Sequence, residues 1–325
     1  EPSKERSVNP DQFIPPTRPT LYFVGVTTGK SSIMNVFPRW AEQLGIDADI
    51  RGIDLELHAP ADDYRTTVEF LRDAEFAKGA LVTTHKLDLF DAARDMFDYI
   101  DPHAELMSET SCISKRGDQL RCHAKDPITG GFAVDAIMPP GAWAGNEAEA
   151  LFIGAGGSTV AITWHLMQAS RGADRPARIH VANRSRPRLE HIRAVHEQIG
   201  ADVPVEYHHC PDPTDSDAVV ASLPPGSLVV NATGLGKDAP GSPITHAVDF
   251  PVDTVVWDLN YRGDLIFLDI AEAAPDETRV RVEDGWIYFM HGWLQVIGEV
   301  FDVEIPTSGP DFEVLSDLAG GAPQR

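Results

Sequence analysis

A lysine and an aspartate occupy two positions from which a parallel α/β sheet could present reactive groups. Lys86 follows the apolar run 80–85, and Asp126 precedes Pro127 at the expected start of a helix. The carboxyl ends of parallel strands line the ligand crevice of such a sheet, so both side chains can face one cleft. A lysine can exchange a proton with a substrate oxygen while a neighbouring carboxylate orients it and stabilises its charge. We therefore predict a proton-transfer pair, while Asp126 can also cap its helix.

A second chemical feature is the glycine-rich segment 151–161, in which an apolar strand leads through Gly-x-Gly-Gly into a helix-forming run. Glycines let the backbone turn tightly and approach a pyrophosphate, whose charge then sits on the free N–H groups at the helix start. A glycine-bearing turn without a ligand is the alternative. The predicted cofactor contacts of this turn are Gly154, Ala155, Gly156, Gly157 and Ser158.

The end of the next strand discriminates between the two nicotinamide cofactors. An NAD-specific fold places an acidic residue there to bind the ribose 2′-hydroxyl. Here the chain has Asn183, Arg184, Ser185, Arg186 and Arg188 instead. Arginines suit a 2′-phosphate through charge-assisted hydrogen bonds, so the pattern favours NADP(H). The alternative is a solvated, arginine-rich helix start.

These residues must be positioned by an α/β framework, because short apolar runs alternate with amphipathic stretches along most of the chain. We predict an N-terminal α/β substrate-binding domain over 20–138, joined by 286–325, and a Rossmann-type nucleotide domain over 139–285. The Pro-Pro-Gly segment near 139–144 marks the boundary. A hairpin turn over 115–118 interrupts the βα order. The amphipathic stretch 286–303 is expected to return as a helix to the first domain.

Composition excludes several classes of protein. The 325 residues carry 50 acidic and 27 basic side chains, a formal charge of −23, so nucleic acid is not the expected partner. No apolar run is long enough to span a membrane, and residues 1–19 are predicted to be a flexible leader. Three cysteines without CxxC spacing support neither a disulfide framework nor a structural zinc site, and they fit a cytoplasmic protein. We predict no metal, and the sequence does not decide whether the chain forms a homodimer.

Taken in order, these motifs resemble the shikimate dehydrogenase family over roughly residues 20–303. Lys86 falls in that family's lysine motif, Asp126 and Gly131 fall in its Asn-Thr-Asp-Gly-x-Gly region, and the glycine turn and the Asn183 element follow. Two further strand ends, 230–233 and 258–261, complete the series. The resemblance implies an NADP-dependent oxidoreductase that interconverts a ring ketone and a secondary alcohol on a small polyhydroxylated cyclic carboxylic acid, with a role in aromatic amino acid biosynthesis.

The resemblance also implies contacts for the individual residues. Lys86 would be the proton donor and acceptor and Asp126 its partner, while Asn231 and Thr233 would contact the cofactor. His291 could replace Gln295 as the substrate contact on the last helix. The implied substrate contacts are Ser31, Ser32, Thr83, Ser111, Tyr261 and Gln295. Ser32 has an alternative role as an ordinary helix cap.

Departures from the family pattern bear on the substrate. The family's Asn-Thr pair falls near Ser111, the threonine of the lysine motif is replaced or shifted at Thr83, and Ala124-Lys125 precedes the aspartate. A site built on specific hydrogen bonds discriminates strongly when a partner is lost. A cyclitol, a quinate-like acid or an amino-substituted analogue therefore stays open as substrate. Two other readings also stay open: a catalytically silent NADP-binding sensor, and an enzyme resembling methylene-tetrahydrofolate dehydrogenase.

Overall fold

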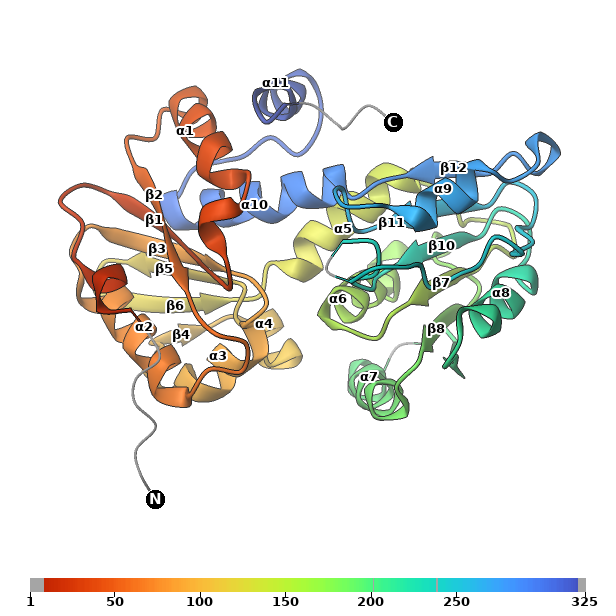
Figure 1. The fold of residues 1–325 in the computed structure, drawn as a ribbon, viewed down its shortest axis with the longest axis horizontal. Coiled ribbons are helices and arrows are strands. Elements are labelled where there is room, and N and C mark those ends of the chain that lie inside the picture. The colour runs from red at the N-terminus through yellow and green to blue at the C-terminus, as the bar shows by residue number, and fades with distance from the viewer. Residues whose placement is uncertain (1–8, 201, 238, 321–325) are drawn as a thin grey trace. The chain divides into compact units, whose positions relative to one another are not determined.

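The computed structural model describes residues 9–200, 202–237 and 239–320, which form two compact units (Figure 1). The first unit comprises the chain up to Lys125 and from Gly292 onward, and the second runs from Asp126 to His291. Each unit contains its own six-stranded sheet. The α/β class and the two-domain organisation predicted from the alternating sequence pattern are confirmed.

The first unit is built on a mixed sheet with the strand order β2-β1-β3-β5-β6-β4. β1 runs parallel to β2 and β3, whereas β5 is antiparallel to β3 and to β6. The reversal from β5 to β6 is produced by the predicted hairpin, where Gly117 adopts a left-handed φ of +59°. The strands are β1 (Thr20–Gly25), β2 (Asp49–Asp54), β3 (Ala77–Val82), β4 (Tyr99–Ile100), β5 (Cys112–Arg116) and β6 (Gln119–His123).

Helices pack on this sheet, and α2 and α3 close one face. Tyr64 of α2 and Leu89 of α3 belong to the same buried apolar cluster as Tyr22 and Val24 of β1. The helices are α1 (Ile33–Leu44), α2 (Ala61–Asp73), α3 (Lys86–Ala93), α4 (Pro102–Met107), the second part of α10 (Trp286–Phe301) and α11 (Pro310–Leu318), with 3-10 turns η1 (Pro10–Phe13), η2 (Thr28–Lys30) and η3 (Arg94–Met96).

The C-terminal part of α10 packs against the first sheet. Trp293 lies edge-on to Phe23 of β1, with ring centroids 4.9 Å apart, and Phe301 stacks on Phe37 of α1 at 6.2 Å. Gly79 of β3 leaves room for Val300, since an added Cβ would come within 3.0 Å of that side chain. The predicted return of the C-terminal helix to the first domain is confirmed, and aromatic packing accounts for it.

Part of the segment assigned to a flexible leader is packed. Residues 1–8 lie outside the described residues, but Pro10–Phe13 form η1. Phe13 contacts Phe70 of α2 edge-on at 5.3 Å, and the side-chain amide of Gln12 donates to the carbonyl oxygen of Asp54 at 3.3 Å. This apolar anchor beside the edge strand β2 orders residues that composition alone assigned to a tail.

The second unit has a fully parallel sheet with the order β12-β11-β10-β7-β8-β9. All four residues of β7, β10 and β11 are buried, as expected for a sheet covered on both faces. The strands are β7 (Ala150–Ile153), β8 (Ile179–Asn183), β9 (Val205–His209), β10 (Leu228–Asn231), β11 (Val255–Asp258) and β12 (Arg281–Glu283).

The predicted domain boundary lies near residue 139, whereas the second unit begins at Asp126 and includes α5. Gly130 and Gly131 let α5 approach α6 closely, because an added Cβ would lie 2.8 Å from Ile162 and 2.5 Å from the His165 ring. The remaining helices are α5 (Asp126–Ile137), α6 (Gly157–Leu166), α7 (Arg186–Ile199), α8 (Pro213–Ala221), α9 (Ile266–Glu272) and the start of α10, with 3-10 turns η4 (Ala169–Arg171) and η5 (Asp276–Thr278).

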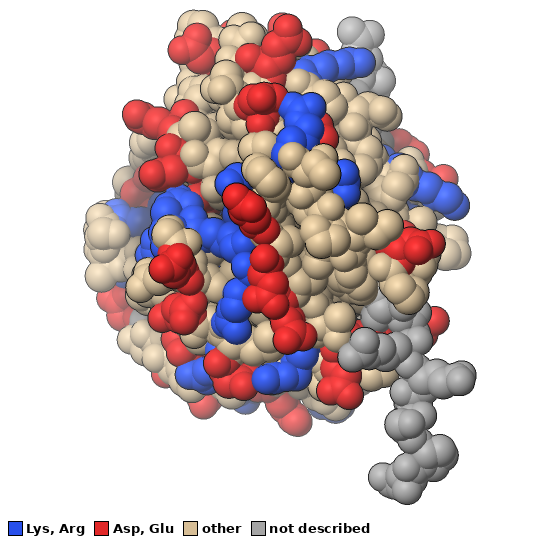
Figure 2. All heavy atoms as spheres, turned by 90° about the vertical axis from the view of Figure 1, so that its left-hand side faces the viewer, with Lys and Arg blue, Asp and Glu red and all other residues tan. Residues whose placement is uncertain are grey.

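Acidic and basic side chains lie beside one another over the face of the first unit shown in Figure 2. Bidentate contacts such as Arg65 with Asp95 illustrate this local pairing.

The three cysteines are free and buried, and burial raises the pKa of Cys122 to about 12. Within the described part of the chain, no helix is both long and apolar enough to cross a bilayer.

A buried histidine is expected to make the second unit less stable in acid. His196 of α7 lies 2.8 Å from the hydroxyl of Thr163 and 2.8 Å from that of Tyr207, and burial lowers its pKa to about 4. The folded state then binds fewer protons than the unfolded chain between pH 6.5 and 4, so stability falls as the pH drops through that window. Each pH unit costs about 1.4 kcal/mol from this one group.

We expect this acid sensitivity in urea unfolding measured from pH 7.5 to pH 4.5. His196→Gln should be less stable at neutral pH but should show a shallower loss toward pH 4.5, because it lacks the titrating ring. His191→Gln, on the exposed face of the same helix, should keep the wild-type slope. Equal slopes for His196→Gln and wild type would remove His196 as the cause.

Candidate active site

The glycine-rich turn lies between β7, which ends at Ile153, and α6, which begins at Gly157. Gly154 has φ +118°, and an added Cβ would lie 2.7 Å from the carbonyl oxygen of Ala232. Glycine alone tolerates this combination of dihedral angle and close approach. The first N–H groups of α6 have no acceptor within the helix, so they suit a phosphate group. The turn therefore fits a dinucleotide.

A pocket of about 620 Å³ opens beside this turn, within the second unit. Its size is in the range of cofactor sites, roughly 300–1,000 Å³. The predicted cofactor residues that line it are Gly154, Ala155, Gly156, Asn183, Arg184, Ser185, Arg188 and Thr233. Gly157, Ser158 and Asn231 are absent from its lining: the Ser158 hydroxyl accepts a hydrogen bond from Tyr288, and Asn231 is completely buried.

The end of β8 presents two arginines to the pocket. The Asn183 side chain accepts a hydrogen bond from the N–H of Ser185 at 2.8 Å, which sets the turn into α7. Arg184 and Arg188 are exposed, and among the described residues neither has a carboxylate within 4 Å. Asp212 is the one acid in the lining, so the charged side chains of the pocket are two cations and one anion. The pocket is therefore locally positive, although the whole chain has a net charge of −23. Arg186, the third predicted cation, does not line the pocket.

Side chains behind the pocket hold its far wall in place. Asn231 accepts from the backbone N–H of Thr233 at 3.0 Å and from its hydroxyl at 2.6 Å, and it donates to Asp258 at 3.1 Å. Asn260 does not line the pocket, but its side-chain amide donates to the carbonyl oxygen of Thr233 at 3.2 Å. The motifs at 230–233 and 258–261 therefore act together: they fix the loop that presents Thr233.

Part of the pocket lining was not predicted: four residues of the loop after β10, and one whole wall, the segment after β9. No glycine signature marks it, and it reaches the pocket because β9 lies beside β8 in the sheet. The Asp212–Pro213 pair at the start of α8, with its capping box, was the available local signal for a helix start here. The missed lining residues are Cys210, Pro211, Asp212, Pro213, Ser216, Gly234, Leu235, Ala239 and Pro243.

In the first unit, Lys86 is the first residue of α3, directly after the turn that follows β3. Thr84 in this turn has a φ of +62°, a strained conformation for a β-branched residue. The chain is held there by the Thr83 N–H bonding to Val24 at 3.0 Å and by the Lys86 carbonyl oxygen accepting from the Thr110 N–H at 3.0 Å. The backbone of Lys86 is therefore fixed from two sides.

A buried network supports the same turn. The ring of His85, next to Lys86, lies 3.1 Å from the Tyr64 hydroxyl, which also donates to Asp88 at 3.4 Å. Burial raises the pKa of Tyr64 to about 12, with the Asp88 charge adding to the effect. Burial also lowers the pKa of His85, so at neutral pH its ring is uncharged. The helix start that carries Lys86 is thus positioned by three polar side chains.

The loop after β1 carries the predicted serines. Thr28 is buried and donates to the Asp54 carboxylate through its N–H at 2.8 Å and its hydroxyl at 2.6 Å. Ser31 and Ser32 follow, both half-buried, and Ser32 makes no side-chain capping bond to α1. The cap alternative for Ser32 is therefore not adopted. Substrate binding by the two serines stays a prediction.

The Ser111 hydroxyl forms hydrogen bonds to backbone groups. The residue is buried, its hydroxyl donates to the carbonyl oxygen of His123 at 3.4 Å, and it accepts from the Lys125 N–H at 2.7 Å. These bonds join the start of β5 to the end of β6. The two hydrogen bonds give this hydroxyl a structural function, whereas the substrate contact implied by the family pattern stays a prediction.

A charged cluster around Glu299 of α10 was not predicted. Its carboxylate accepts from the Lys125 ammonium at 2.8 Å and lies 3.3 Å from His123, whose other ring nitrogen is 3.2 Å from Asp101. Burial opposes ionisation, but the Lys125 hydrogen bond and the neighbouring cations lower the pKa of Glu299. Lys125 precedes Asp126, so this cluster anchors the chain just before the predicted catalytic carboxylate. Lys125 and Glu299 are 174 residues apart in the sequence, so no local sequence pattern predicts their contact.

The remaining candidates are distributed between the units. Asp126 is buried and is itself the first residue of α5. Tyr261 packs into an aromatic cluster, 4.5 Å from the Phe289 ring. His291 lies 5.3 Å from Phe132, and burial lowers its pKa to about 4. Gln295 is half-buried on the part of α10 that belongs to the first unit. The pairing of Lys86 with Asp126 and the contacts of Tyr261 and Gln295 stay predictions.

The known proteins to which the chain is similar include several shikimate dehydrogenases. No protein-family model matches the chain. A shikimate dehydrogenase (NADP(+)) of Rhodopseudomonas palustris strain BisB18 is 35% identical over 164 residues, so the match spans about half of each protein. The enzyme of the same name from strain CGA009 is 28% identical over 281 residues, which cover 85% of this chain and 88% of that protein.

Solved structures show the same fold. Quinate dehydrogenase from Corynebacterium glutamicum in complex with NAD aligns with a TM-score of 0.72 at 20% identity, covering 93% of this chain and 98% of that one. Shikimate dehydrogenase from Aquifex aeolicus aligns at 0.69 and 17% identity with the same coverage. The 5-ketofructose reductase of Gluconobacter sp. strain CHM43 aligns at 0.64 and 17% identity over 94% and 99%. The chain is therefore distantly similar to shikimate dehydrogenases over most of its length, and its fold is that of the solved shikimate and quinate dehydrogenases.

Proposed function

We propose that this protein is an NADP-dependent dehydrogenase that interconverts a ring ketone and a secondary alcohol on a small polyhydroxylated cyclic carboxylic acid, 3-dehydroshikimate and shikimate or a close analogue. The observation that carries the cofactor assignment is the arginine-lined end of the pocket. Arg184 and Arg188 have no carboxylate partner among the described residues, and no acid replaces them at the end of β8. The family supplies the reaction class.

The chemistry divides between the cofactor and the chain. When bound, the nicotinamide supplies a hydride to the substrate carbonyl carbon. The Lys86 ammonium donates a proton to the oxygen that becomes the alcohol, and Asp126 orients the ammonium and stabilises its charged form. In the reverse direction neutral Lys86 accepts the hydroxyl proton. The fixed start of α3 suits this role, because proton transfer requires a donor held in one place.

Two residues bear on the substrate. At positions where the family pattern has hydrogen-bonding partners for the ring, Ser111 bonds to backbone groups and Lys125 bonds to Glu299. Because the Ser111 hydroxyl and the Lys125 ammonium already have protein partners, the site would offer fewer hydrogen bonds to the hydroxyl groups of the substrate ring. We therefore propose a small polyhydroxylated cyclic carboxylic acid as the class of substrate. Quinate-like and amino-substituted acids are candidate substrates together with shikimate.

A substrate panel tests the proposal by following NADPH absorbance. The ketones would be 3-dehydroshikimate, 3-dehydroquinate and the neutral ketone 5-ketofructose, each also assayed with NADH. We expect turnover of at least one cyclic keto acid with NADPH, slower turnover with NADH, and none with the neutral ketone, which lacks a carboxylate. Tight NADPH binding with no turnover across the panel would instead support the silent sensor. Turnover of the neutral ketone alone would refute the assignment to carboxylic acids.

A further inference from the structure

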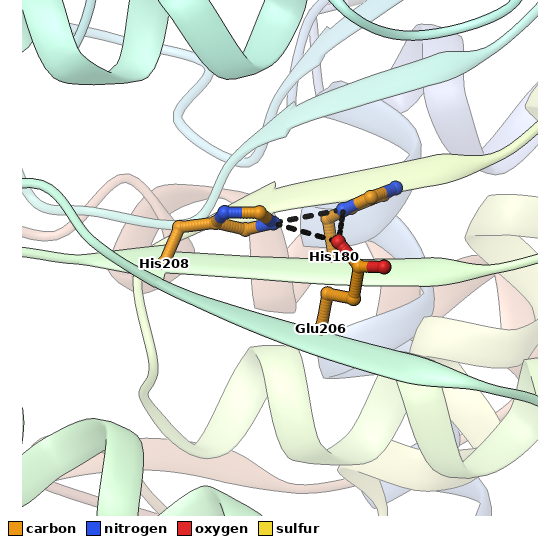
Figure 3. A group of neighbouring side chains, drawn as sticks. All are labelled: His180, Glu206 and His208. Carbon is orange, nitrogen blue, oxygen red and sulfur yellow. Dashed lines mark hydrogen bonds and ion pairs between the residues drawn. The ribbon is translucent and has the colours of Figure 1, made fainter.

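Three potential metal ligands converge on the second sheet, outside the nucleotide pocket. His180 of β8 and Glu206 and His208 of β9 direct their side chains toward one another (Figure 3). The Nδ1 of His180 lies 2.9 Å from the Nε2 of His208, and the Glu206 Oε2 lies 3.8 Å and 3.9 Å from these two nitrogens. None of the three residues lines the pocket.

The parallel register produces this arrangement. His180 is opposite Glu206 and Ala182 is opposite His208 in the β8–β9 ladder. Side chains two residues apart on a strand share a face, so Glu206 and His208 lie on the same side of the sheet as His180. Strands are rigid elements, and ligands placed on them are held more accurately than ligands on loops.

A carboxylate behind His180 completes the arrangement. The Nε2 of His180 lies 2.7 Å from Glu149, whose side chain is 17% exposed. A ring that donates from Nε2 to this carboxylate has its Nδ1 lone pair directed toward His208 and Glu206. Metal-binding histidines commonly carry such a carboxylate partner, which fixes the tautomer and raises the basicity of the ring. Arg178 contacts both Glu149 and Glu206, so two carboxylates here share one guanidinium.

We propose that His180, Glu206 and His208 form a binding site for a zinc ion, with Glu149 as the residue that positions His180. The point equidistant from the three ligand atoms lies about 2.1 Å from each, which is the length of a zinc bond to nitrogen or oxygen. Both rings must turn toward Glu206 to replace their mutual hydrogen bond with bonds to the ion. Two histidines, one carboxylate and a water give zinc its usual four ligands.

The ion would clamp β8 to the edge strand β9. Both strands lead directly into the pocket wall, since Asn183 and Cys210 line it two or three residues beyond His180 and His208. The site is separate from the predicted proton-transfer residues, so its proposed role is to stabilise this edge of the second unit. It is independent of whether the proposed reaction is correct.

Zinc binding to untagged, chelator-stripped protein tests the site by isothermal titration, with thermal melting as a second readout. We expect one zinc ion per chain and a higher melting temperature with zinc. His208→Ala and Glu206→Gln should weaken binding at least 100-fold, and Glu149→Gln should weaken it about 10- to 100-fold. His191→Ala, an exposed histidine of α7, should bind zinc as wild type does. Cobalt titration should give the visible absorption of a tetrahedral ion in wild type and not in His208→Ala.

Circular dichroism of each zinc-free variant separates lost ligation from lost folding. His208 and Glu206 are partly exposed, so both variants should fold as wild type does. Wild-type protein that binds no zinc, or a folded His208→Ala variant with wild-type affinity, would overturn the proposal. Because first-row metals follow a common affinity order, copper or nickel should also bind, and their binding must be lost in the same variants.

Discussion

Lys86→Ala should lower kcat by about 10²- to 10⁴-fold in the substrate panel, the usual contribution of a positioned proton donor. NADPH affinity should stay unchanged, because Lys86 lies in the first unit and the pocket lies in the second. Lys86→Arg is the more stringent variant: it keeps the positive charge but cannot release its proton near neutral pH. We expect kcat to stay low in Lys86→Arg, with KM closer to wild type than in Lys86→Ala.

Control variants test whether the effect is specific to the position of Lys86 and whether Lys86 acts together with Asp126. Lys78→Ala removes a lysine near the start of β3, the strand that precedes the turn to Lys86, and should leave kcat within twofold of wild type. Asp126→Asn should also lower kcat. If Lys86 and Asp126 act as one unit, the double variant should lose little more than the worse single variant. Additive losses would argue against a pair, and wild-type turnover in Lys86→Ala would remove Lys86 from the mechanism.

Arg184→Ala and Arg188→Ala should each raise the dissociation constant for NADPH by about 10- to 100-fold, with a much smaller effect on NADH. A hydrogen bond to a charged group contributes about 1.5–3 kcal/mol, and the two arginines are the pocket's cations. The affinity of wild type for NADPH should fall as ionic strength rises, because salt screens the local attraction of these two arginines for the 2′-phosphate. Fluorescence titration with both cofactors measures these effects.

Arg186→Ala is the matched control for this experiment. It removes an exposed arginine from the same helix start without altering the pocket lining, so NADPH affinity should change less than twofold. Equal losses for NADPH and NADH in Arg184→Ala would show that the arginine binds a part common to both cofactors. A larger loss in Arg186→Ala than in Arg188→Ala would contradict the placement of the 2′-phosphate. A salt-independent affinity would also contradict it.

Elements with a strong local signal were predicted well. The apolar run before the glycine turn forms β7 and the run after it forms α6, as the pattern of segment 151–161 predicts. Short elements such as α4, α9 and β4 were not predicted, because a few residues carry too little periodicity to announce a helix or strand. The assignment of α5 also differed, since its close contact with α6 depends on glycines that mark no boundary in the sequence.

The amino-acid sequence by itself determined the α/β class, the glycine turn at Gly154 and the basic character of the segment after β8. These features depend on residues that are neighbours along the chain, where backbone propensity and periodicity operate. Only the tertiary structure decided that Cys210 and Asp212 reach the pocket, that Lys125 pairs with Glu299, and that His180 meets His208. Such contacts depend on strand order and register, which are set by packing the whole sheet and leave no trace in a local pattern.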